Sequence, residues 1–201
     1  MTKTKDIREL IEEKELWLRD CREQIGSQKT ERLSWAYVMD IATILKDNFE
    51  LKTLDLEGCK IDDGYNGMYG SGVLSDALEK NHTLKHLGLS NNNIDDIGAV
   101  ALAEALRKNN SLEYLYLFDN EIGSGGAIAL AQALKVNKTL KGLELSGNNK
   151  IRNIGALFLL EVLRESTSLR WIRLENKTLS STTLDELNSI NQNKRTEREL
   201  G

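Results

Sequence analysis

The sequence contains no proline, only two cysteines and only two histidines. Without proline, every turn must be formed by Gly, Asn, Asp or Ser. The cysteines, Cys21 and Cys59, lie in different segments and indicate neither a disulfide framework nor a metal site, so we expect ordinary thiols. The sequence also lacks a nucleophile elbow, an H-E-x-x-H motif and paired acids at a recognisable spacing. We therefore expect no enzyme activity, no cofactor, no metal and no small-molecule substrate.

Long apolar runs and a strong excess of one charge are absent too. The first residues lead into a charged amphipathic stretch, so we expect no signal peptide and no transmembrane segment. The net charge is −4, and the 27 basic residues are interspersed with 31 acidic ones, which gives no electrostatic reason to bind nucleic acid or a membrane. We expect the protein to remain in the cytoplasm where it is made, or in a host cytoplasm if a bacterium delivers it there.

The sequence does contain a repeated motif, whose clearest copy spans Leu112 to Ile122 with the pattern L-x-x-L-x-L-x-x-N-x-I. Leu115 and Leu117 alternate with Tyr116, as in a strand that points its leucines to one face and its tyrosine to the other. Asn120 follows where the chain leaves the strand, and its amide can bond backbone groups of its own and neighbouring turns. The motif predicts one strand and one turn of a stacked repeat.

Four further stretches copy this spacing. Two copies lie 28 residues before and 28 residues after the first, and two looser copies at the ends of the array have lost the asparagine, as terminal repeats usually do. The predicted parallel strands are centred near residues 53–56, 86–89, 114–117, 142–145 and 171–174. The asparagines expected to form a buried ladder bonded to backbone are Asn92, Asn120 and Asn148, whereas Cys59 and Lys177 stand at the corresponding terminal positions.

A helix pattern, G-A-x-x-L-A-x-A-L, follows each turn, most clearly over residues 98–106 and 126–134. Its small alanines allow close approach to the sheet, and its leucines fill the space between. Helices stack roughly 10 Å apart and strands about 4.8 Å apart, so the array must curve with its strands on the concave face. The predicted fold class is α/β, a right-handed β-α superhelix shaped as a horseshoe segment with five parallel strands inside and helices outside.

The ends of the chain differ from this array. Residues 6–25 carry apolar residues at helical spacing, which predicts an N-terminal capping helix within residues 1–32; a helix that binds a partner or dimerises is the alternative. A second helix ends near Asn48 and forms a half-repeat at the start of the array, which we place at 33–190. Residues 191–201 are expected to form a charged, frayed tail.

Asparagines in four N-x-S/T sequences, Asn81, Asn109, Asn137 and Asn176, also recur with the repeat. The first three stand at intervals of 28, where each helix ends before the next strand. We interpret them as part of the repeat and not as glycosylation sites.

These repeats resemble the ribonuclease-inhibitor-like class of leucine-rich repeats, in which a unit of 28 or 29 residues pairs L-x-x-L-x-L-x-x-N with the alanine-rich helix. The resemblance covers residues 33–190. Members include ribonuclease inhibitor, a GTPase-activating protein, the C-terminal domain of tropomodulin and secreted effectors of intracellular bacteria, and what they share is protein binding. The resemblance implies a non-enzymatic scaffold, with a regulator of a partner enzyme, GTPase-activator-like or inhibitor-like, as the alternative. Delivery as a bacterial effector stays open.

The predicted contact surface is the concave face, where a protein or peptide would bind a monomer or weak dimer of this chain. Aromatic residues are concentrated among the concave positions, and Gly88 and Gly142 beside them are expected to leave open space against the rings. The alternative is that the rings only cover one another or are covered by a terminus of the chain. The candidate binding residues are Tyr114, Tyr116, Phe118, Trp171, Arg173, His86 and Glu144.

Overall fold

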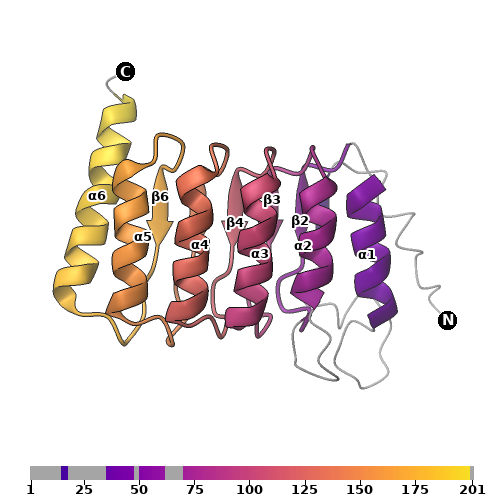
Figure 1. The fold of residues 1–201 in the computed structure, drawn as a ribbon, viewed down its shortest axis with the longest axis horizontal. Helices are drawn as coiled ribbons and strands as arrows, with labels where there is room; N and C mark the ends of the chain where they lie inside the picture. The colour runs from indigo at the N-terminus through magenta and orange to yellow at the C-terminus, as the bar shows by residue number, and fades with distance from the viewer. Residues whose placement is uncertain (1–14, 18–34, 48–49, 62–69, 200–201) are drawn as a thin grey trace.

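The computed structural model describes residues 15–17, 35–47, 50–61 and 70–199. Strands and helices alternate along the array, and the helices lie side by side on one surface (Figure 1). The strands are β1 (Glu15–Trp17), β2 (Thr53–Asp55), β3 (His86–Gly88), β4 (Tyr114–Tyr116), β5 (Gly142–Glu144) and β6 (Trp171–Arg173). The helices are α1 (Trp35–Asp47), α2 (Gly70–Lys80), α3 (Asp96–Lys108), α4 (Ser124–Val136), α5 (Asn153–Glu165) and α6 (Ser181–Glu199).

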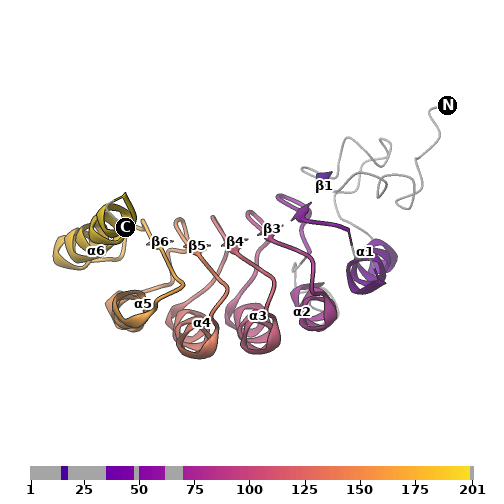
Figure 2. The ribbon, with the colours of Figure 1, turned by 90° about the horizontal axis from the view of Figure 1, so that it is seen from above.

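The strands form one parallel sheet in the order β1-β2-β3-β4-β5-β6. The five predicted strands are confirmed, each in register with the next, so that Leu54, Leu87 and Leu115 lie in one row across the sheet. Seen from above, the strands line the inner side of an arc and the helices its outer side (Figure 2). The predicted horseshoe segment is therefore confirmed.

The first strand, β1, corrects the prediction of an N-terminal helix. Residues 15–17 pair in parallel with β2, and Leu16 is in register with Leu54. The apolar residues over 6–25 fit a helical spacing, but the unpaired edge of β2 favours an extended chain at Glu15–Trp17. The rest of the predicted helix, and with it the choice between a capping and a partner-binding helix, lies outside the described residues.

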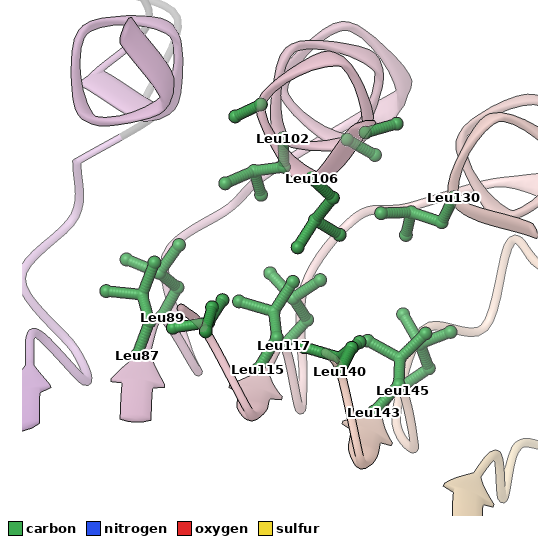
Figure 3. Close-up of a cluster of buried hydrophobic side chains, with 14 of the residues drawn as sticks. Leu87, Leu89, Leu102, Leu106, Leu115, Leu117, Leu130, Leu140, Leu143 and Leu145 are labelled. Carbon is green, nitrogen blue, oxygen red and sulfur yellow. The ribbon is translucent and has the colours of Figure 1, made fainter. Parts of the chain in front are cut away.

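The core lies between the sheet and the helices. Leucines of the strands and turns point toward leucines of the helices and fill the layer between them (Figure 3). Leu115 and Leu117 are fully buried, as are Leu102 and Leu130 on the helices that face them. Ala99, Ala103 and Ala127 are also buried and allow the helices to approach the sheet closely. Burial of this continuous row of leucines is the main force that holds the repeats together.

The predicted asparagine ladder is confirmed at the edge where the strands end, which we call the strand-exit edge. Asn92, Asn120 and Asn148 are buried. The side-chain oxygen of Asn120 accepts hydrogen bonds from the backbone N–H groups of Asn92 and Ile94 on the preceding turn. Its side-chain nitrogen donates to the carbonyl oxygen of Leu89 on that turn and of Leu117 on its own. Each asparagine thus satisfies buried backbone groups of two turns.

A second ladder of asparagines lies at the opposite edge, where the helices end, which we call the helix-exit edge. Asn81, Asn109 and Asn137 are buried there. The oxygen of Asn109 accepts from the N–H groups of Ser111 and Leu112, and its nitrogen donates to the carbonyl oxygens of Leu78 and Asn81. Since both polar atoms of these side chains are buried and bonded, the interpretation of the three N-x-S/T sequences as part of the repeat is confirmed.

The terminal repeats replace the ladder asparagine in different ways. Cys59 is buried and forms a disulfide bond, so the expectation of an ordinary thiol is wrong for this residue; Cys21 lies outside the described residues. The pairing of β1 with β2 places residues 15–17 beside the repeat that contains Cys59, which the spacing of the cysteines does not reveal. In the last repeat Asn176, and not Lys177, donates to the carbonyl oxygens of Asn148 and Ile151.

Helix α6 closes the C-terminal end of the sheet. It extends through Glu199, so the expected frayed tail is helical over residues 191–199. Asn191 explains this extension, because its side chain donates to the carbonyl oxygen of Ile172 and accepts from the N–H group of the same residue in the edge strand β6. Lys194 donates to the carbonyl oxygen of Ser166. The polar side chains of the tail thus satisfy exposed backbone groups of the last repeat.

The division of the chain into three units at residues 32 and 190 stays a prediction.

Candidate functional site

The concave face presents two rows of side chains that alternate with the buried leucines. The first row contains Thr53, His86, Tyr114, Gly142 and Trp171, and the second contains Asp55, Gly88, Tyr116, Glu144 and Arg173. The parallel register places each residue directly beside its counterpart on the next strand, about 4.8 Å away. The candidate binding residues other than Phe118 therefore lie in two neighbouring rows, and Phe118 follows β4 with 44 % of its surface exposed.

Three rings of the first row are in contact. The centroids of His86 and Tyr114 are 4.7 Å apart with an interplanar angle of 18°, and those of Tyr114 and Trp171 are 6.3 Å apart at 28°. Trp171 reaches Tyr114 across Gly142, and a Cβ atom on that glycine would overlap the indole. The expectation of open space at Gly142 is therefore wrong, because Trp171 fills it. Tyr114 and Trp171 therefore partly cover one another, and the role of these rings in binding a partner stays a prediction.

The second row ends in a cation. The guanidinium carbon of Arg173 lies 5.0 Å from the centroid of the Trp171 ring, and a guanidinium nitrogen lies 3.8 Å from a carboxylate oxygen of Glu144. The Arg173 side chain is 67 % exposed, whereas that of Glu144 is 13 % exposed and accepts a hydrogen bond from the Ser146 N–H group. Arg173 thus lies over an aromatic surface with most of its donors directed to solvent.

A pocket of about 320 Å³ remains on the N-terminal half of the concave face. Its wall includes Tyr116, whose hydroxyl has a pKa raised mainly by burial and further by the neighbouring Tyr114. At Gly88, the other position where open space was expected, a Cβ atom would overlap the Asp55 carboxylate, so that part of the space is filled. The lining residues are Thr53, Leu54, Asp55, Glu57, His86, Gly88, Ser90 and Tyr116.

Sequence reasoning missed the role of Asp55 in this pocket. Asp55 and Glu57 share the concave face, and acids on such a face are usually solvated. Asp55 is instead buried, with an oxygen that accepts the N–H group of Glu57, and its carboxylate extends over Gly88. The available signal was the glycine on the neighbouring strand, because a missing side chain gives an adjacent carboxylate room to lie flat.

The described residues contain no group of three or more His, Cys, Asp or Glu side chains that could hold a metal ion. None of the described helices combines the length and the apolar character needed to cross a bilayer.

Comparisons with known proteins agree with the fold. A family model described as leucine-rich repeat matches residues 47–64, 80–103, 108–131 and 136–160. Actin-binding site 2 of leiomodin-1 is similar in structure, with a TM-score of 0.69, 20 % sequence identity, and coverage of 84 % of this chain and 94 % of that one. The tropomodulin C-terminal domain of Caenorhabditis elegans has a TM-score of 0.67, 17 % identity, and coverage of 81 % and 96 %. No curated protein matches the sequence.

Proposed function

Because the chain is a leucine-rich repeat protein of the ribonuclease-inhibitor-like kind, we propose that it is a non-enzymatic scaffold that binds a protein or peptide on its concave face. The observation that carries this proposal is the stacked row of His86, Tyr114 and Trp171, continued by the exposed guanidinium of Arg173. Rings that already support one another lose little conformational entropy when a partner covers them, which is typical of interface hot spots.

The dimensions of the concave face favour a slender partner. Five strands spaced about 4.8 Å apart span roughly 19 Å, which fits a peptide, a helix or the corner of a domain better than a broad globular surface. The pocket beside Tyr116 gives such a partner a recess for one side chain, and the stacked rings give it a flat surface next to that recess. We propose that the partner contacts both the pocket beside Tyr116 and the stacked rings.

A regulator of a partner enzyme is the second candidate. Such a protein could insert a cation into the active site of its partner, and Arg173 on the edge strand β6 is an exposed cation of the concave face. Its contacts with Trp171 and Glu144 favour a positioning role within the binding surface instead. The two candidates differ in one measurement, since only a regulator changes the turnover of the protein that it binds.

The first experiment is affinity capture with the immobilised chain, from the cytoplasm of its source cell and from a host cytoplasm if the source is an intracellular bacterium. Purified actin is a defined protein to include, because the related leiomodin domain is described as an actin-binding site. Any partner is then titrated by calorimetry against the parent chain and against Tyr116→Ala and Trp171→Ala. We expect each substitution to weaken binding by at least about 1–2 kcal/mol without unfolding the protein.

The matched control is Val136→Ala, because Val136 is an exposed apolar residue at the end of α4 and not in a strand. The control is expected to bind like the parent chain. Unchanged affinity in both concave variants would refute the concave site. A recovered enzyme whose turnover changes when the chain is added, and no longer changes with Arg173→Ala, would favour the regulator instead.

A further inference from the structure

The outer surface of the helices carries an apolar band. Ile97 and Val100 on α3 are 57 % and 44 % exposed, and Ile154 and Leu157 on α5 are 54 % and 51 % exposed. Ile128 on α4, which is partly exposed, occupies the repeat position equivalent to Val100 and Leu157. We call these five residues, all in the N-terminal halves of three neighbouring helices, the convex band. Exposed apolar side chains gathered in one place, as here, mark interaction surfaces more often than scattered ones do.

The C-terminal halves of the same helices have a different character. They carry charged residues that pair between neighbouring helices, as Lys108 does with Glu79, Lys135 with Glu161 and Arg164 with Glu186. The aliphatic residues are therefore confined to one half of the outer surface, although the repeat offers equivalent exposed positions in both halves. Val136, at 55 % exposure, is the isolated exception at the end of α4.

The shape of the convex band suits contact with a flat surface. On an arc, the middle helix of three protrudes beyond the line that joins the outer two, and α4 is the middle helix here (Figure 2). The position equivalent to Ile97 and Ile154 is Gly125 on α4. Because glycine has no side chain, this position adds no bulk to the protruding helix, and a hollow of about 570 Å³ lies beside it. The missing side chain reduces the protrusion of α4 within the convex band.

The charges at the two ends of the band are opposite. Asp95 and Asp96 lie next to Ile97 in the chain, whereas Lys150 and Arg152 lie shortly before Ile154, and all four of these charged residues line the hollow. Lys150 pairs with Glu121, and Arg152 forms no ion pair with any residue that the structure describes. A surface with exposed aliphatic residues on both sides of a hollow, acidic groups on one side and basic groups on the other, is complementary to itself after a two-fold rotation.

We propose that the convex band is the interface of a weak homodimer with a two-fold axis parallel to α4. Under this axis Ile97 and Val100 of one copy face Ile154 and Leu157 of the other, and Arg152 of each copy faces the acidic end of its mate. Ile128 of the two copies meets near the axis. The contact is small for a protein interface, so the dimer is expected to form only at high protein concentration. The concave faces of both copies remain open to a partner.

The first test measures the molar mass of the full chain by sedimentation equilibrium over a range of concentrations up to about 1 mM. The parent chain is expected to self-associate, and Ile154→Ser is expected to weaken the association at least about tenfold. Val136→Ser is the matched control, because it removes an equally exposed aliphatic residue outside the band. A parent chain that stays monomeric over the whole range, or equal losses in the two variants, would overturn the proposal.

The second test locates the axis. A residue close to a two-fold axis meets its own copy, so Ile128→Cys is expected to form an interchain disulfide under mild oxidation, whereas Val136→Cys is not. Cross-linking of both variants alike would mean that the contact is not centred on the band. Trp171→Ala is expected to dimerise as the parent chain does. A failure of the concave binding site would therefore not refute the dimer, and a monomeric parent chain would not refute the concave binding site.

Discussion

The strand-exit and helix-exit edges of the array use the same amino acid for different tasks. At the strand-exit edge the oxygen of Asn120 accepts N–H groups of the preceding turn, so the asparagine fixes the spacing between two turns. At the helix-exit edge the oxygen of Asn109 accepts N–H groups two and three residues further along its own turn, and only its nitrogen reaches the preceding one. Asn120 thus mainly links two repeats. Asn109 mainly shapes its own turn, and its nitrogen also links that turn to the preceding one.

The largest effect is expected from Asn120→Ala. Alanine would leave the N–H groups of Asn92 and Ile94 and the carbonyl oxygen of Leu89 without partners in a buried place, whereas the carbonyl oxygen of Leu117 would still accept from Asn148. This should lower the free energy of unfolding by about 1–3 kcal/mol. Urea unfolding followed by circular dichroism measures this. Asn188→Ala on the exposed surface of α6 is the control and should change stability little. A variant of Asn120 that melts like the parent chain would refute the role assigned to the ladder.

A smaller loss is expected from Asn109→Ala, about 1–2 kcal/mol in the same measurement. The two N–H groups that lose their acceptor here are close to the end of a helix, where a local rearrangement of the turn can satisfy them in part. If Asn109→Ala proves more damaging than Asn120→Ala, the difference drawn between the two edges is wrong.

The smallest effect is expected from Glu113→Gln at the start of β4. Lys141 and Lys85 both contact the Glu113 carboxylate and hold its pKa below the ordinary value of a glutamate. A lowered pKa in the folded state means that the stabilisation is complete above the unfolded pKa, about 4.3, and is lost as the pH falls below it.

We therefore expect Glu113→Gln to cost up to about 1 kcal/mol at pH 7 and less at pH 3 or in high salt. Thermal melts of both proteins at the two pH values measure the difference. A loss that is the same at pH 7 and pH 3 would show that shape, and not charge, is what Glu113 contributes.

The repeat was predictable from the sequence because its signals are local and occur several times. The alternation around Leu115 gives the strand, the alanine-rich pattern gives the helix, and a spacing of 28 gives the stack. The strand-exit ladder followed from the same motif, since Asn120 falls where a buried turn needs hydrogen-bond partners. The helix-exit ladder was visible only as recurring asparagines, and nothing in their spacing showed that their side chains bond the preceding turn.

What could not be predicted depends on contacts between segments that are distant in the chain. The strand β1 forms because the sheet offers it an unpaired edge, which outweighs a helical spacing of apolar residues. Trp171 covers Gly142 because the glycine on the neighbouring strand leaves room for a long side chain from the next repeat. In both cases the contact is formed with a neighbouring strand. Which residues become neighbours depends on how the strands stack, and the sequence pattern of a single repeat does not show this.

The direction of the ladders has a consequence for the order in which the protein is completed. Asn92, Asn120 and Asn176 at one edge, and Asn109 at the other, all bond backbone groups of the turn that precedes them in the chain. A ribosome produces the preceding turn first, so each new repeat is left with unsatisfied groups until its successor emerges. Loss of the last repeat would leave the carbonyl oxygens of Asn148 and Ile151 without the Asn176 side chain, whereas loss of the first would leave the N–H groups of Lys85 and His86 without their backbone acceptor, Lys52. The asparagine side chains therefore give each repeat a direction, because every repeat closes the turn of the one made before it.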